Sequence, residues 1–368
     1  MSDTLHAPAP ETKPWPVMTI QEAHALLTRP GSRFETEETV IRGVRTRVWK
    51  NAPPTLRDIF LSGQSFKDRE FVVHEDERAT YPAFGKAVLT LAHQLIADGV
   101  KKGDRVAIIM RNLPEWPVAF FAGALIGAIV TPLNAWWTGA ELKYGLKDSG
   151  AKIAIVDGER LDRLTASLST FTELEKIYVS RSDATYADAR IHRLEDVIGV
   201  VNAWGELAEQ PMPAVELAPD DDATIFYTSG TTGAPKGAIA THRNITSNVM
   251  ATGVAQARGF VRRGEPLPES DPHKLPQRVT LLVVPMFHVT GCFATLCPGI
   301  NAGGKLVLMR KWDTVEGMRL IERERVTNTG GVPTIAWQLV EHPERDKYDL
   351  SSIQGINYGG APAAPDLV

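Results

Sequence analysis

Arg105-Val-Ala-Ile-Ile-Met110 is the stretch of sequence that decides the fold. A short, continuously apolar run of this kind predicts a strand that is buried on both faces of a sheet. Outward from it, the expected elements are a helix at about Pro117–Gly127, a strand at Ile129–Leu133, a helix at Gly139–Asp148 and a strand at Lys152–Asp157. Strict alternation with short connections predicts an α/β fold, in which helices cover both faces of a mostly parallel sheet.

A second alternating series follows a polar, proline-containing link near Glu209–Asp222. Its expected elements are a strand at Ala223–Thr228, a helix from about Asn244, a strand at Val279–Val284, a helix near Cys292–Asn301, a strand at Lys305–Met309, a helix from Asp313 and a helix after Gly331–Pro333. We therefore expect two stacked α/β subdomains, 51–220 and 221–368. A ligand should bind in the crevice that they form.

Three further segments complete the organisation of the chain. Residues 1–50 are expected to be a leader with one short helix, which the capping box Thr19-Ile-Gln-Glu22 begins. A longer helix is expected at about Thr80–Asp98, followed by Gly99. Residues 258–277 contain four prolines and mixed charges, and a solvated insertion is favoured there over a lid or a partner-binding loop.

Residues 116–140 carry no charged side chain, so the stretch is long enough to span a membrane. Pro132, Asn134 and Gly139 interrupt its second half. A helix followed by a short buried strand is therefore the favoured interpretation, and no transmembrane segment is expected.

Composition excludes several classes of partner. The 40 basic and 44 acidic residues give a net charge of −4, which favours a small-molecule ligand over nucleic acid or an anionic membrane. Cys292 and Cys297 both lie in apolar sequence and are expected in the core of a protein from a reducing compartment. The first residues lack a basic segment followed by an apolar run, so no secretory signal is expected and a cytoplasmic location is favoured.

Tyr227-Thr-Ser-Gly-Thr-Thr-Gly-Ala-Pro-Lys-Gly237 has the composition of a phosphate-binding loop. Its glycines let backbone N–H groups turn inward, its hydroxyls add donors, and Lys236 adds a mobile positive charge. The segment is expected between a strand and, after a polar link, a helix, which favours a polyphosphate site over a merely flexible loop. It is neither a Walker loop, since lysine precedes glycine, nor a nucleophile elbow around Ser229.

Together with Pro285-Met-Phe-His-Val-Thr-Gly291 and Tyr358-Gly-Gly-Ala-Pro362, this loop resembles the adenylate-forming (AMP-binding) superfamily. That superfamily includes acyl-CoA synthetases, aryl-CoA ligases, firefly luciferase and the adenylation domains of peptide synthetases. The likeness extends from about Thr55 onward and includes Lys102-Gly-Asp-Arg-Val-Ala107 and Asn134.

The resemblance implies roles for individual residues. Catalytic roles are implied for Thr228, Lys236 and His288, and His288 would stand where the acid, the α-phosphate and the entering thiol meet. Side chains give no confident metal site: Mg²⁺ would bridge the ATP phosphates, with Thr228 as the side chain within reach. Nucleotide binding is implied for Thr228, Ser229, Gly230, Thr231, Thr232, Gly233, Lys236, Gly359, Gly360, Ala361 and Pro362.

The substrate that the resemblance implies is a carboxylic acid without an amine, either fatty or aromatic. Amino-acid-activating members usually offer an aspartate to the amine in the corresponding region, whereas the residues from Phe287 to Cys292 include no carboxylate. Contacts with the acid are expected from His288, Val289, Gly291, Cys292, Val332, Trp337, Tyr358 and Gly359. The apolar members of this set would serve equally well as core residues.

The implied reaction converts the acid and ATP to acyl-AMP and pyrophosphate, and then forms a thioester with coenzyme A. Two alternatives stay open: an enzyme that loads a carrier protein, and a non-catalytic nucleotide-binding fragment. The family's later motifs and its small domain with a catalytic lysine do not occur before Val368. We therefore expect a truncated chain that does not turn over unaided, with a homodimer among the assemblies left open.

Overall fold

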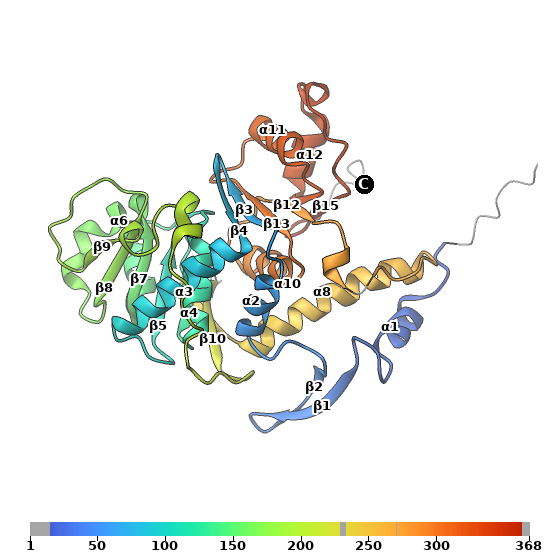
Figure 1. Ribbon diagram of the computed structural model, residues 1–368, viewed down its shortest axis with the longest axis horizontal. Coiled ribbons are helices and arrows are strands. Elements are labelled where there is room, and N and C mark those ends of the chain that lie inside the picture. Colours follow the sequence, from blue (N-terminus) through green and yellow to red (C-terminus); the bar gives the residue numbers. More distant parts are fainter. Residues whose placement is uncertain (1–14, 229–232, 270, 363–368) are drawn as a thin grey trace, which may run out of the picture. The chain divides into compact units, whose positions relative to one another are not determined.

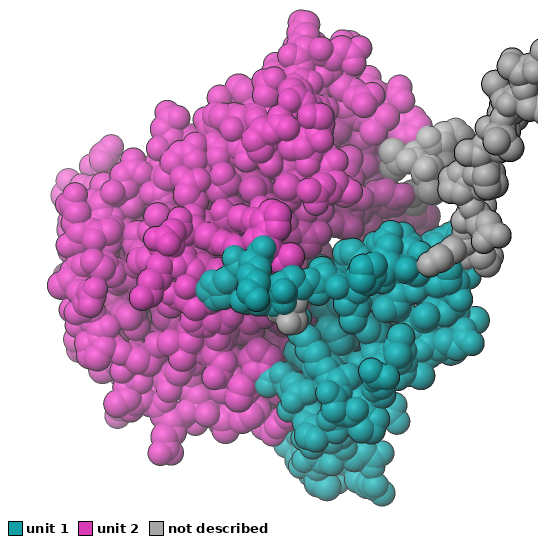
Figure 2. All heavy atoms as spheres, turned by 45° about the vertical axis from the view of Figure 1, so that its right-hand side comes forward, with its two compact units in different colours: residues 1–52, 250–274 teal, residues 53–249, 275–368 magenta. Residues whose placement is uncertain are grey.

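The computed structural model describes residues 15–228, 233–269 and 271–362. These residues form two compact units, which Figure 2 colours separately. The smaller unit combines the N-terminal residues up to Ala52 with residues 250–274. The larger unit contains residues 53–249 and 275–368.

The smaller unit has its own apolar core. Thr19 and Glu22 form the predicted capping box of α1 (Ile20–Thr28), and β1 (Thr36–Ile41) pairs antiparallel with β2 (Val44–Trp49). The remaining elements are the end of α8 (His242–Arg262) and the short 3₁₀ helix η3 (Pro272–Lys274). The core consists of Ala23, Leu27, Phe34, Met250, Val254, Ala257 and Val261.

Two expectations for this unit need correction. The described part of residues 1–50 is a packed hairpin and helix, not only a leader with one helix. The solvated insertion predicted at 258–277 is wrong at its beginning, because α8 continues to Arg262 and buries Val261. An apolar stripe at helical spacing outweighs the polar composition of the segment that follows it.

The first sheet of the larger unit has the order β11-β10-β6-β5-β7-β8-β9 in the described residues. Every neighbouring pair is parallel except β10 and β11. The strands are β5 (Arg105–Ile109), β6 (Ile129–Pro132), β7 (Ala151–Asp157), β8 (Lys176–Ser180), β9 (Ile191–Arg193), β10 (Asp222–Thr228) and β11 (Lys236–Thr241).

The second sheet has the order β15-β14-β12-β13-β3-β4, again parallel except for the terminal hairpin β3–β4. Figure 1 shows the hairpin next to β13, a strand that comes more than two hundred residues later in the sequence. The strands are β3 (Glu70–His74), β4 (Glu77–Thr80), β12 (Val279–Leu282), β13 (Lys305–Leu308), β14 (Asn328–Gly331) and β15 (Gly355–Tyr358). The expected boundary between residues 220 and 221 therefore does not separate the two sheets.

The helices that cover the two sheets of the larger unit lie in three layers (Figure 1). Alternate residues of β5, such as Val106 and Ala107, point to opposite faces, one into the main core and the other into a second core under α5 and α6. Between the sheets lie α2 (Leu56–Gln64), α3 (Tyr81–Ala97), α4 (Glu115–Leu125) and α10 (Cys297–Asn301). The outer layers contain α5 (Gly139–Ser149) and α6 (Gly158–Leu164) on the first sheet, and α11 (Thr314–Glu324) and α12 (Pro333–Glu341) on the second. The fold is thus the predicted pair of stacked α/β layers.

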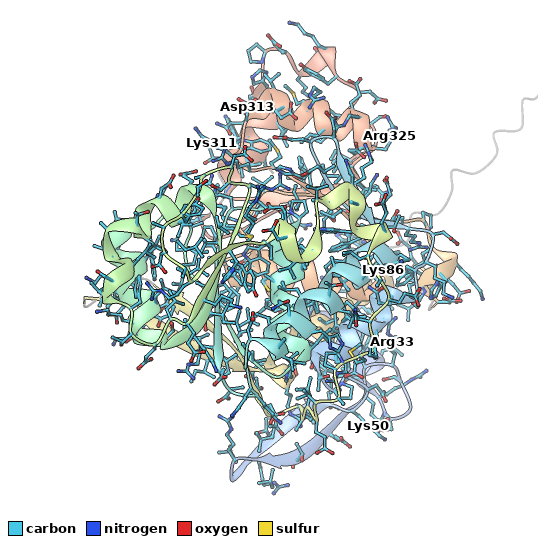
Figure 3. All side chains as sticks on the ribbon, turned by 60° about the vertical axis from the view of Figure 1, so that its left-hand side comes forward. Arg33, Lys50, Lys86, Lys311, Asp313 and Arg325 are labelled. Carbon is cyan, nitrogen blue, oxygen red and sulfur yellow. The ribbon has the colours of Figure 1, made fainter. Side chains whose placement is uncertain are left out.

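Polar residues at the helix ends explain where several helices begin and stop. Thr138 and Glu141 form a capping box on α5, and Gly150 ends that helix in the left-handed conformation. Asp313 caps α11 and Arg325 follows its last residue, both labelled in Figure 3. The remaining short elements are α7 (Glu195–Ile198), α9 (Val289–Gly291), the 3₁₀ helices η1 (Thr165–Thr170), η2 (Val201–Glu206) and η5 (Arg345–Lys347), and the π-helix η4 (Cys292–Leu296).

The uncharged stretch 116–140 forms a core helix and an inner strand, as predicted. Every residue of α4 is buried, and β6 lies between β10 and β5. Across the described residues, the helices are all too short or too polar to cross a bilayer.

His242 at the start of α8 makes the stability of the larger unit depend on pH. Its Nδ1 accepts a hydrogen bond of 3.2 Å from the backbone N–H of Leu56, and burial lowers the pKa of the imidazole to about 4. The unfolded chain, with a histidine pKa of about 6.5, binds the proton more readily. The stabilisation is therefore complete above about pH 6.5 and falls by on the order of 3 kcal/mol toward pH 4.

His242→Asn should remove most of this dependence, because the amide oxygen can accept from Leu56 but does not titrate in this range. The measurement is urea denaturation at pH 7.5 and at half-unit steps down to pH 4.5. Wild type should lose stability faster than the variant as pH falls. Parallel curves for the two proteins would show that His242 is not the titrating group.

Candidate functional site

The carboxyl ends of the parallel strands of both sheets face each other, and Asn112 joins them. This side chain follows β5 in the first sheet and is 5% exposed. Its Nδ2 donates to the carbonyls of Leu282 (3.3 Å) and Val284 (3.2 Å), and its Oδ1 accepts from the N–H of Met286 (2.9 Å). One buried amide therefore fixes the chain just beyond β12. Clefts at this edge of parallel sheets are where α/β proteins bind ligands.

Two further contacts cross the same junction. The Arg111 guanidinium donates to the carbonyl of Arg310 just beyond β13, through Nε at 3.1 Å and a terminal nitrogen at 3.0 Å. Trp136, beyond β6, packs edge-on against Phe287 with ring centres 5.1 Å apart. The two sheets are thus held together along several neighbouring strands.

The predicted phosphate loop connects two antiparallel strands. Thr228, the last residue of β10, lies opposite Lys236, the first residue of β11, and its Oγ1 donates weakly to the Lys236 carbonyl at 3.4 Å. Both side chains are exposed. Gly233 has a φ of 138°, which favours glycine. The expected arrangement of strand, loop and helix is therefore corrected to a β-hairpin, since Lys236–Thr241 pairs with β10 before α8 begins. Ser229, Gly230, Thr231 and Thr232 lie outside the described residues.

The stems of this hairpin are tied to α5. The Tyr227 hydroxyl donates to Asp148 Oδ2 at 2.7 Å, and the Tyr144 hydroxyl donates to the Pro235 carbonyl at 3.0 Å. Burial and the Asp148 hydrogen bond raise the pKa of Tyr227, so its phenol stays protonated. Trp137 packs edge-on against the Tyr227 ring with ring centres 5.8 Å apart.

His288 lies on a tight turn beyond β12 and is exposed. Its backbone N–H donates to the Pro285 carbonyl at 3.1 Å, and its Nδ1 accepts from the N–H of Thr290 at 3.2 Å, which orients the ring as the cap of α9. Phe293, in the π-helix that follows, packs against Phe226 of β10 at 4.9 Å between ring centres. The His288 segment and β10, the strand that leads into the predicted phosphate loop, are therefore neighbours.

The third predicted segment lies beyond β15. Strands β12, β14 and β15 are adjacent and parallel, with Gly331 paired to Tyr358, so the chain beyond all three emerges at one edge of the sheet. The Gly359 N–H donates to the Gly331 carbonyl at 3.0 Å, and Gly360 has a φ of 81°. Ala361 and Pro362 are exposed, as are Tyr358 and Gly359.

The apolar residues expected at the acid have different surroundings. Val289, Val332 and Trp337 are all partly open to solvent, with 42%, 49% and 39% of their surface exposed. Cys292 is completely buried in the main core with Cys297, and burial raises the pKa of its thiol. Contact of any of these side chains with a substrate stays a prediction.

Several side chains that hold the three predicted segments in place were not predicted from the sequence. Asn112 lies two residues after the predicted strand Arg105–Met110, and a polar residue just beyond the end of a parallel strand could have indicated a role at the site. Tyr144 and Asp148 lie four residues apart on a predicted helix, so one face of that helix carries both. Nothing local in the sequence indicates that this face meets Tyr227. In the described ranges, no group of three or more His, Cys, Asp or Glu side chains could hold a metal ion.

Gly291 allows the tight turn at His288. A Cβ at this position would lie 2.2 Å from the Pro285 carbonyl oxygen, which the His288 N–H also contacts. Gly291→Ala should therefore destabilise the protein by about 1–3 kcal/mol through overpacking. The matched control is Gly299→Ala in α10, where a Cβ would meet only Leu306 at 3.9 Å.

Urea denaturation of both variants checks this prediction. Gly299→Ala should keep wild-type stability or gain up to about 1 kcal/mol from helix propensity. Equal stability of the two variants would contradict the close packing at Gly291.

Comparison with known proteins agrees with this geometry. The family model described as "AMP-binding enzyme" matches residues 60–368. A 4-coumarate-CoA ligase of Narcissus pseudonarcissus is 30% identical over 346 residues, which cover 92% of this chain and 58% of that protein. A long-chain-fatty-acid–CoA ligase of Bacillus subtilis is 28% identical over 325 residues, covering 83% and 55%. The chain spans about half the length of the curated relatives that it matches.

Solved structures give the same result. The crystal structure of the inhibitor-bound N-terminal domain of FACL13 from Mycobacterium tuberculosis aligns with a TM-score of 0.69 at 26% identity, over 86% of this chain and 72% of that one. The match of the family model spans both sheets and all three predicted site segments. The chain therefore belongs to the family of AMP-binding enzymes.

Proposed function

We propose that this chain provides the ATP- and acid-binding region of an acid–thiol ligase. In the first step, a carboxylate oxygen attacks the α-phosphorus of ATP, and pyrophosphate leaves. In the second step, the thiol of coenzyme A attacks the acyl carbon, and AMP leaves. Both steps depend mainly on holding the reactants in register, which can contribute about 7–11 kcal/mol.

The observation that carries the proposal is the hairpin of β10 and β11, in which the exposed residues Thr228 and Lys236 pair at the two ends of the predicted phosphate loop. A glycine-containing loop with hydroxyl donors and a lysine suits a triphosphate. Mg²⁺ would arrive with the nucleotide as Mg²⁺·ATP, and the Thr228 hydroxyl is the side chain assigned to it. The segment Gly359–Pro362, beyond the second sheet, is assigned to the adenine.

The acid is assigned to the surface around His288. The imidazole is exposed and oriented by its own helix cap, which suits a group that must contact a charged carboxylate. Val289, Val332 and Trp337 offer exposed apolar surface for an acyl chain or an aromatic ring. The names of the relatives include both classes of acid, 4-coumarate and long-chain fatty acid. A panel of free coenzyme A and carrier-protein thiols would identify the acceptor of the acyl group. A cytoplasmic location fits these substrates.

Lys236→Ala tests the nucleotide assignment. Loss of a charge-assisted phosphate contact should weaken Mg²⁺·ATP binding by about 1.5–3 kcal/mol, measured by calorimetry. Lys86→Ala is the control, because Lys86 lies on α3 and donates to the Gly205 carbonyl at 3.0 Å. Unchanged binding in Lys236→Ala would remove the lysine from the phosphate site.

His288→Ala tests the acid assignment separately. The variant should bind a stable acyl-adenylate analogue several-fold more weakly, because the imidazole contacts the acyl–phosphate junction, and its affinity for Mg²⁺·ATP should change less. Calorimetry with aromatic and long-chain analogues would measure both effects and rank the two acid classes. An equal loss for ATP and for the analogue would argue against a role at the acid.

A further inference from the structure

We propose that Tyr144 and Asp148 on α5 are positioning residues that hold both arms of the phosphate hairpin, which is defined by its described residues Tyr227–Thr228 and Gly233–Lys236. The proposal rests on the proposed function, because it takes the hairpin loop as the site of the ATP triphosphate. It adds two residues outside the loop, to which the family motifs give no role.

The two hydrogen bonds lie on different arms of the hairpin, on either side of the paired residues Thr228 and Lys236. Asp148 accepts from Tyr227, which immediately precedes Thr228, and Tyr144 donates to the carbonyl of Pro235, which immediately precedes Lys236. Thr228 and Lys236 are paired across the hairpin. The residues that begin and end the loop are therefore each one peptide unit away from a contact with α5.

Helix α5 is capped at both ends and packed against the core, so it can hold these contacts in place. Its first turn is closed by the capping box of Thr138 and Glu141, and Gly150 closes its end. Leu142 and Leu146 anchor it in the core beneath the first sheet. Tyr144 and Asp148 are four residues apart, which places them on one face one turn from each other. The helix can therefore fix the spacing of the two stems.

The charge of Asp148 indicates that it acts through Tyr227. A carboxylate would repel a triphosphate, so a direct contact with the nucleotide is unfavourable. The carboxylate instead accepts a hydrogen bond from a phenol that stays protonated. A hydrogen bond to a charged acceptor is stronger than one between neutral groups, and it holds the tyrosine in one orientation.

The contacts of Tyr144 and Asp148 with the hairpin, here called the clamp, are accessible to solvent. Variants at these positions should therefore affect the hairpin without a large loss of global stability. An open depression of about 460 Å³ is lined by Ala140, Lys143, Tyr144, Lys147 and Asp148. Asp148 is exposed and Tyr144 is half-buried. Shortening either side chain should therefore leave no closed cavity in the core, and global stability should change little.

The test compares Asp148→Ala, Asp148→Asn, Tyr144→Phe and Tyr227→Phe, with Lys147→Ala as the control from the same depression. Mg²⁺·ATP affinity is measured by calorimetry. Asp148→Ala, Tyr144→Phe and Tyr227→Phe should each bind roughly 3- to 10-fold more weakly, as expected for loss of one such hydrogen bond. Asp148→Asn keeps an acceptor and should retain most of the affinity, and the double variant Asp148→Ala/Tyr227→Phe should be no weaker than the worse single variant.

Amide hydrogen exchange without nucleotide provides the second readout. Exchange across residues 225–240 should increase in Asp148→Ala and stay at the wild-type rate in Lys147→Ala, with unfolding midpoints unchanged. Wild-type ATP affinity in Asp148→Ala, or a fall in all affinities in proportion to global stability, would overturn the proposal. If the wild-type protein binds no nucleotide, the proposed function fails, and hydrogen exchange alone tests the clamp. Faster exchange across residues 225–240 in Asp148→Ala would then support it, and unchanged exchange would refute it.

Discussion

The three hydrogen bonds of the Asn112 amide are the interaction on which the site depends, because they form the buried polar link between two sheets that otherwise share a large apolar core. Apolar packing between helices has little direction and would tolerate sliding of one sheet against the other. A buried amide that uses both its donor and its acceptor fixes the register of β5 against the chain beyond β12. The phosphate hairpin and the turn at His288 belong to different sheets, so their separation is set by this junction and by the aromatic contacts beside it.

Local elements of the fold were predictable where short-range physics decides them. The apolar run at Arg105–Ile109 and the capping box before α1 gave a strand and a helix at the expected places. The uncharged stretch 116–140 divided into α4 and β6 as expected, because Gly127 and Pro132 limit how far one helix can extend. The predicted site segments follow β10, β12 and β15, which the rule for parallel sheets anticipates.

The arrangement of strands was not predictable from the same signals. Hairpin β3–β4 joins the second sheet and hairpin β10–β11 joins the first, so the sheets exchange strands across the boundary expected near residue 220. Strand pairing is non-local and leaves no periodicity in the sequence. Strand β11 was missed because Lys236–Thr241 is mostly exposed and begins with Lys-Gly. The Tyr227–Asp148 pair was missed for a related reason, since 79 residues separate its members.

The hairpin form of the phosphate loop has an electrostatic consequence. In loops that run directly into a helix, the helix dipole places about half a positive charge at the phosphates without any ion or side chain. Here the chain after the loop continues as β11, and strand dipoles largely cancel. Under the proposed function, neutralisation of the bound triphosphate would then be left to backbone N–H groups, to the Lys236 ammonium and to the cation that accompanies the nucleotide. Such charges would be screened by salt, and under the proposed function the site would release its anionic product without the movement of a helix.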